Sequence, residues 1–138
     1  MSRKDLVIDC SISLAWYLED ERSSFTDAIL NKLPSFNVWL PTLWRTEFSN
    51  AMLMAYKRNR ISRSWLEASV NNANQRPFHY DDYSVSMLEL LKLAQEYNLT
   101  SYAATYLELS MRKKASLATL DNALIKAAKA AHVHLVEK

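Results

Sequence analysis

With 138 residues, 49% of them hydrophobic and 23% charged, the chain fits one globular domain, residues 1–138, whose core needs no disulfides. Its formal net charge of +2 permits an RNA substrate without arguing for one. Glycine is absent, which excludes a Walker loop and a dinucleotide-binding fingerprint, because both need glycine where the backbone approaches phosphate.

The start of the chain mimics a signal peptide, with basic residues followed by an apolar stretch. Asp5 and Asp9 interrupt that stretch, and no small-residue cleavage site follows. No run approaches the roughly 18 apolar residues of a membrane span. Because the single cysteine, Cys10, also suits a reducing compartment, we expect a cytoplasmic protein with no membrane partner.

Short apolar segments predict the strands of a parallel sheet. The first holds a continuous apolar run from Leu6 to Ile8, which is typical of a strand covered on both faces. The predicted strands are residues 4–9, 36–40, 77–80, 116–119 and 133–136.

Segments with apolar residues at helical spacing separate these strands. Asn59 and Asn98 follow helical patterns, and we expect them in the left-handed conformation that glycine would otherwise take. Strands that alternate with helices predict an α/β fold, a five-stranded parallel sheet with helices on both faces. Each helix follows a polar residue that can cap it, namely Ser11, Ser23 or Ser24, Thr42, Ser62 or Ser64, Ser84, Thr100 or Ser101, and Asp121 or Asn122.

Three carboxylates are predicted to meet at one edge of this sheet. Asp9 ends the first strand, Asp121 follows the fourth, and Glu47 lies early in the helix after the second, between apolar helix neighbours. Oxygen ligands of this kind suit Mg²⁺ or Mn²⁺, and such a metal site suits phosphodiester hydrolysis. Each acid alone also has a structural interpretation: Asp9 and Asp121 as helix caps, and Glu47 as a partner of Arg45 or Arg58.

Other reactive side chains carry weaker signals. The three histidines lack the spacing of a zinc site, and Cys10 has no histidine placed to activate it. The Trp and Met residues are expected mainly in the core, although Trp16 and Trp65 are candidates for an interface.

Four stretches of the sequence resemble the PIN-domain family, specifically the VapC-like toxins of type II toxin–antitoxin pairs. VIDCS resembles the first acid motif, with Ser11 beside Asp9, and LPTLWRTEFSNAM resembles the second, with Glu47. LATLDNALIKAA resembles the fourth, with Thr119 beside Asp121. The resemblance covers essentially the whole chain and implies that Asp9, Glu47 and Asp121 are metal ligands.

The third motif departs from the family pattern. LTSYAATYLELS carries the expected tyrosines, Tyr102 and Tyr106, but Ala103 stands where the family has an acid. Glu108 cannot replace that acid, because it points about 140° around the helix from position 103. Deliberate inactivation and natural loss of activity would each explain Ala103.

The resemblance implies a metal-dependent endoribonuclease acting on structured RNA such as tRNA, weakened or inactive here, together with a homodimer and a cognate antitoxin. The alternative is a catalytically dead PIN-like module that binds RNA or an antitoxin. A signalling receiver domain fits less well, because it needs an acidic pair after the first strand and a lysine near the last. Basic residues that are candidates to guide RNA are Lys57, Arg58, Arg60 and Arg63, although each of them alone is more simply interpreted as part of a solvated helix end.

Overall fold

The structure is a computed structural model that describes residues 3–137. Four parallel strands form one sheet in the order β3-β2-β1-β4. The strands are β1 (Lys4–Ile8), β2 (Phe36–Pro41), β3 (His79–Asp81) and β4 (Ser116–Ala118). Leu6, Val7 and Ile8 of β1 are fully buried at its centre, as the continuous apolar run predicts.

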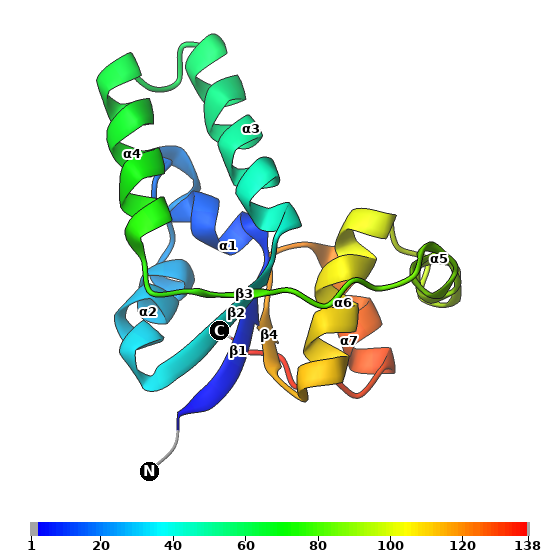
Figure 1. Ribbon diagram of the computed structural model, residues 1–138. Coiled ribbons are helices and arrows are strands. Elements are labelled where there is room, and N and C mark those ends of the chain that lie inside the picture. The colour runs from blue at the N-terminus through cyan, green and yellow to red at the C-terminus, as the bar shows by residue number, and fades with distance from the viewer. Residues whose placement is uncertain (1–2, 138) are drawn as a thin grey trace.

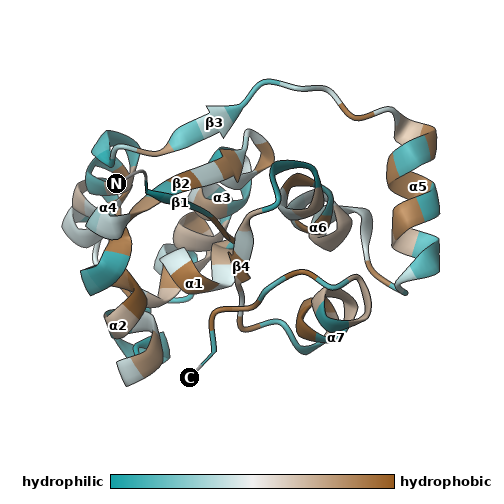
Figure 2. Cartoon of the chain, turned by 90° about the horizontal axis from the view of Figure 1, so that it is seen from below, coloured by the Kyte–Doolittle hydropathy of each residue, from teal (hydrophilic) through white to brown (hydrophobic). Residues whose placement is uncertain are grey.

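Helices cover both faces of the sheet (Figure 1). On one side lie α1 (Cys10–Ala15), α2 (Ser24–Lys32), α3 (Leu43–Lys57) and α4 (Arg63–Gln75), and on the other lie α6 (Ser101–Lys113) and α7 (Asn122–Ala130). Helix α5 (Met87–Glu96) packs on α6 and stands away from the sheet, as Figure 2 shows. Two short 3-10 turns, Glu19–Glu21 and Leu33–Ser35, complete the fold. No helix within residues 3–137 is long and apolar enough to cross a membrane.

The prediction of a fifth strand at residues 133–136 is wrong. Only Leu135 bridges to Leu117, through hydrogen bonds that join Leu117 to His134 and Val136 at 2.9 and 3.0 Å. The ladder cannot extend, because β4 has only three residues and the chain then turns at Thr119 toward β1. The described residues therefore form a four-stranded sheet with one additional bridge.

Most helix boundaries follow the predicted caps. Ser23, Ser62, Thr100 and Asp121 each accept a hydrogen bond at the start of a helix. The prediction for Ser11 is wrong: Asp9 caps α1, because the helix begins one residue after the acid that ends the strand. Ser84 is likewise replaced by Ser86 as the cap of α5, and Thr42 makes no side-chain cap bond.

Left-handed residues end four of the helical segments. Asn59 and Asn98 have φ of 61° and 54°, which confirms the role predicted for asparagine in a chain without glycine. His132, at 61°, takes the turn after α7, and Lys114, at 54°, ends α6 without any sequence signal.

Candidate active site

Asp9 lies directly after β1, where its backbone N–H donates to the Ala118 carbonyl oxygen of β4 at 3.2 Å. Asp9 is only 7% exposed. Its carboxylate accepts hydrogen bonds from the hydroxyls of Ser11 and Thr119, both at 2.5 Å. Burial raises the pKa of Asp9 above its usual value, although both hydroxyls oppose the shift by stabilising the charged form.

Asp121 caps α7 on the loop that follows β4, the neighbour of β1 in the sheet. Two hydrogen bonds of 3.0 Å fasten this loop around Asp9: the Thr119 hydroxyl accepts from the Asp121 N–H, and the Ser11 hydroxyl accepts from the Leu120 N–H. Besides burial, the negative charge of Asp121 raises the pKa of Asp9. The Thr119 hydroxyl therefore connects the Asp9 carboxylate to the Asp121 backbone at the carboxyl edge of the sheet.

Glu47 is half-buried on α3, and its carboxylate accepts a hydrogen bond of 2.5 Å from the Tyr106 hydroxyl of α6. Burial raises the pKa of Glu47, and the tyrosine hydroxyl opposes that shift. Burial also raises the pKa of Tyr106, as do the adjacent Glu47 and, more weakly, the charge of Asp9. Tyr106 thus contacts Glu47 directly and lies within electrostatic reach of Asp9.

Ala103 lies in the first turn of α6, where its N–H donates to the capping hydroxyl of Thr100. It precedes Tyr106 by three residues, which puts both on the same face of the helix. An acid at this position would therefore project from the face that presents Tyr106 to Glu47. Glu108 is committed elsewhere, in an ion pair of 2.8 Å with Arg112, as expected from its different direction around the helix.

None of the three predicted acids forms an ion pair in the part of the chain that the structure describes. An oxygen-only donor set without a cation of its own fits the chemistry of Mg²⁺ or Mn²⁺. The spacing does not form a closed cage, because no three Asp, Glu, His or Cys side chains within residues 3–137 lie together as a metal group. The structure brings Asp9 and Asp121 together and directs Glu47 toward Tyr106.

The predicted RNA-guiding residues gather at the α3–α4 tip, away from the sheet (Figure 1). Arg60 is held by Asp20 and Glu21 at 2.7 and 2.8 Å, and Arg63 is paired with Glu67 at 3.4 Å. Among described residues, Lys57 and Arg58 are exposed and make no ion pair. Lys57 and Arg58 thus remain open to an anionic partner.

Tyr106 is the residue whose contact the sequence did not reveal. The Glu47–Tyr106 hydrogen bond joins residues 59 apart in the chain. The only available signal was that Tyr106 follows position 103 by one helical turn, on the same face. Cys10 beside the site is partly buried, and burial raises the pKa of its thiol, which leaves it a poor nucleophile.

Two of the histidine side chains, those of His79 and His134, contact other side chains of the protein. His79 stacks on Trp39 with 4.9 Å between ring centroids, and the His134 ring contacts the Ser116 hydroxyl at 3.0 Å. Trp44 and Met52 are buried, as expected for core residues, while Trp65 is 48% exposed.

Two solved structures share this fold over almost its whole length. The crystal structure of PAE2754 from Pyrobaculum aerophilum has a TM-score of 0.67 at 20% identity, covering 91% of this chain and 87% of that one. The crystal structure of FitAcB from Neisseria gonorrhoeae has a TM-score of 0.66 at 12% identity, covering 96% of each chain. No protein-family model and no curated protein matches the sequence. The chain thus has a PIN-like α/β fold, with a parallel sheet flanked by helices.

Proposed function

We propose that this chain is a metal-dependent endoribonuclease of the PIN type, a VapC-like toxin that cleaves structured RNA such as tRNA and is weakened by Ala103. One observation carries the proposal. Asp9 is buried at the carboxyl edge of a PIN-like sheet, beside Asp121, and neither has a basic partner among the described residues. Uncompensated acids at such an edge are costly unless a cation joins them.

Asp9, Glu47 and Asp121 are the residues that would hold Mg²⁺ or Mn²⁺, which when bound supplies an activated water and neutralises charge on the phosphate. The protein supplies the orientation. The Ser11 and Thr119 hydroxyls fix both oxygens of the Asp9 carboxylate, and Tyr106 fixes Glu47. Such supporting hydrogen bonds typically change metal affinity or activity by about 10- to 100-fold when removed.

Ala103 removes one acid from the set that the family resemblance implies. A site with three acids instead of four loses a ligand, or an acceptor that orients the attacking water. We therefore expect a well-folded protein with little activity, because alanine suits a helix and one fewer acid reduces repulsion.

A homodimer and an antitoxin are the expected protein partners. Exposed apolar side chains on and beside α5 and α6 support such contacts, including Met87, Leu88 and Leu91 at 88%, 60% and 50% exposure. RNA would meet Lys57 and Arg58 at the end of α3, and we expect the protein to act in the cytoplasm.

The second candidate is a catalytically dead PIN-like module that binds RNA or an antitoxin. Ala103 favours it, as does the lack of a three-ligand group within residues 3–137. This candidate keeps the binding surfaces of the first and gives up cleavage, so position 103 separates the two.

The test is cleavage of a tRNA pool with Mg²⁺ or Mn²⁺, for this chain and for Ala103→Asp. Asp9→Asn in each background is the blank. We expect Ala103→Asp to raise cleavage by about 10- to 100-fold. Cleavage by this chain at the rate of Ala103→Asp would remove position 103 from the site. Cleavage by neither, with RNA binding intact, would favour the binding module.

A further inference from the structure

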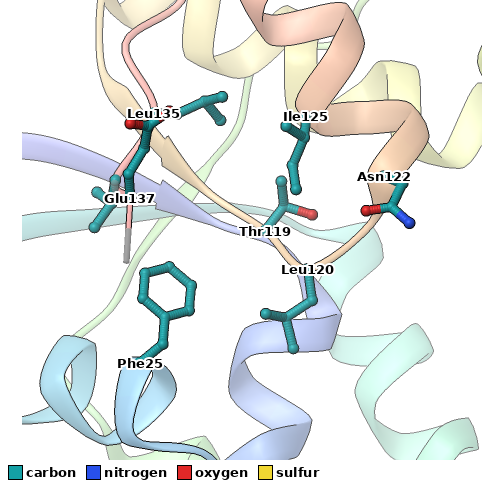
Figure 3. Close-up of a pocket in the computed structure, with 8 residues that line it drawn as sticks. Phe25, Thr119, Leu120, Asn122, Ile125, Leu135 and Glu137 are labelled. Atoms are coloured by element: carbon teal, nitrogen blue, oxygen red, sulfur yellow. The ribbon is translucent and has the colours of Figure 1, made fainter.

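A small cavity lies beside the candidate active site (Figure 3). It has a volume of about 250 Å³, is partly open to solvent, and is bordered by α2, the β4–α7 loop, the start of α7 and the chain after α7. Figure 3 shows Phe25 and Leu120 on one side of this space and Ile125 and Leu135 on the other. The wall is predominantly apolar, and its lining residues are Phe25, Thr119, Leu120, Asn122, Ile125, Leu135, Val136 and Glu137.

The cavity shares a wall with the candidate site. Thr119 lines it and also donates its hydroxyl hydrogen to Asp9. Leu120 and Asn122, which line it as well, flank Asp121 in the sequence. A group bound in the cavity would therefore contact the residue that hydrogen-bonds Asp9 and both sequence neighbours of Asp121.

Polar groups at the cavity can recognise the edge of a ring. The Asn122 amide can both donate and accept, and Asn122 is exposed. Glu137 is also exposed and adds an acceptor for an amino group. Among residues 3–137, no lysine, arginine or histidine lines the cavity, so the described lining disfavours a phosphate or a carboxylate as the occupant.

These properties suit a flat, largely apolar ring with polar atoms at its edge. A volume of about 250 Å³ lies below the roughly 300–1,000 Å³ of sites for drug-sized ligands. The cavity therefore has room for one ring system and not for a whole nucleotide. The Phe25 side chain offers an aromatic surface, and base–aromatic stacking is a main source of affinity for unpaired bases.

We propose that this cavity binds the base of a nucleotide next to the phosphate that is cleaved, and that it favours bases with an exocyclic amino group. The proposal rests on the proposed function, because it assigns to the RNA substrate a base position beside Asp9 and Asp121. An aliphatic side chain of a protein partner is the competing occupant. A base is favoured because the amide of Asn122 and the carboxylate of Glu137 give the cavity polar recognition that an aliphatic chain would not use.

Binding is tested without catalysis, by saturation-transfer NMR on the full chain in EDTA with AMP, CMP, GMP and UMP. We expect saturation of base protons above ribose protons, and weaker saturation for UMP, which has no amino group. Phe25→Leu removes the aromatic ring and should weaken binding at least about fivefold. Ile125→Trp fills the cavity and should abolish the base signal. Phe78→Leu, the same change at the opposite edge of the sheet, is the matched control and should leave binding unchanged.

Three outcomes would overturn the proposal: ribose-only saturation, base saturation that both cavity variants leave intact, and saturation of N-acetyl-leucinamide in place of the bases. Circular dichroism of each variant shows whether a loss of signal comes from unfolding. The failure of the proposed function looks different, because Ala103→Asp would then cleave no RNA while the bases still saturate. If Ala103→Asp cleaves RNA but Phe25→Leu in that background changes neither affinity nor base preference, the cavity assignment fails and the nuclease stands.

Discussion

Two groups of acids lie at the carboxyl end of the sheet, one at β3 and one at β1 and β4, and they differ in one respect. Asp81 and Glu108 are both bound by Arg112, at 2.5 and 2.8 Å. Asp9 and Asp121 lie together with no such cation in the described chain. Arg112 also lies over the Tyr83 ring at 4.6 Å, so its guanidinium contacts two carboxylates and an aromatic ring.

The comparison separates structural acids from acids available for function. Two acids that share an arginine have part of their negative charge neutralised within the protein and need no external cation. An acid pair that is held in place by hydroxyl and backbone N–H hydrogen bonds, with no cationic side chain, keeps its charge and remains open to an external cation. The position of an acid in the sequence does not reveal this difference, because it depends on whether a distant arginine reaches it.

The largest expected effect is a difference in catalysis between the two groups. In the Ala103→Asp background, Asp9→Asn should lower RNA cleavage by about 100-fold or more, since it removes one of the proposed metal ligands. Asp81→Asn in the same background should leave the cleavage rate of the folded protein within about twofold, because Asp81 is outside the proposed metal site. Single-turnover cleavage measures both rates, and equal losses would contradict the distinction.

Stability should respond in the opposite way. Arg112→Leu leaves Asp81 and Glu108 without their partner and should cost about 1–3 kcal/mol, less than for a fully buried pair, because Arg112 is partly exposed. Asp9→Asn should be neutral or stabilising without metal, since asparagine also caps a helix well. Urea unfolding in EDTA gives both free energies, and a larger loss for Asp9→Asn would show that Asp9 is chiefly structural.

Tyr106 offers a smaller test of the proposed metal site, because it hydrogen-bonds Glu47. Tyr106→Phe removes the hydrogen bond to Glu47 and should cost about 0.5–1.5 kcal/mol of stability. In the Ala103→Asp background it should also raise the metal concentration needed for half-maximal cleavage, which a purely structural role would not do. The matched control is Tyr83→Phe, which keeps the ring over Arg112 and should leave that concentration unchanged.

The pH dependence of stability gives the smallest signal. Burial raises the folded-state pKa of Asp9, so the folded protein binds more protons than the unfolded chain above the usual value of 3.8. Stability therefore falls as pH rises through this window, and the cost of the charge is absent below it. Any increase in the free energy of unfolding caused by Asp9→Asn in EDTA should accordingly shrink as pH falls from neutral toward 4. A gain independent of pH would contradict this cause.

Local signals in the sequence were enough for most of the fold. The run from Leu6 to Ile8 predicted a buried central strand, and Asn59 and Asn98 predicted left-handed turns. The predicted strand at 133–136 failed because its apolar pattern did not show that the segment would pair with the three-residue strand β4 through one bridge alone. The left-handed Lys114 had no signal, since lysine has no preference for that conformation.

The candidate site was predictable only in its strand-end placement. Asp9 and Asp121 follow neighbouring parallel strands, and the alternation of strands and helices was enough to suggest this. The Tyr106–Glu47 bond and the Arg112–Asp81 pair join residues 59 and 31 positions apart, and only tertiary packing decides them. Ala103 stood out because the surrounding motif resembles one that carries an acid.

Direct measurement of metal binding tests the central claim most simply. Mn²⁺ titrated into the protein loses its free-ion EPR signal as it binds, which gives an affinity without RNA or turnover. We predict weak binding to this chain, about 10- to 100-fold tighter binding to Ala103→Asp, and loss of that gain in Ala103→Asp with Asp9→Asn. Asp81→Asn should change nothing. Equal Mn²⁺ affinity in all four proteins would contradict the assignment of Asp9, Glu47 and Asp121 as a metal site.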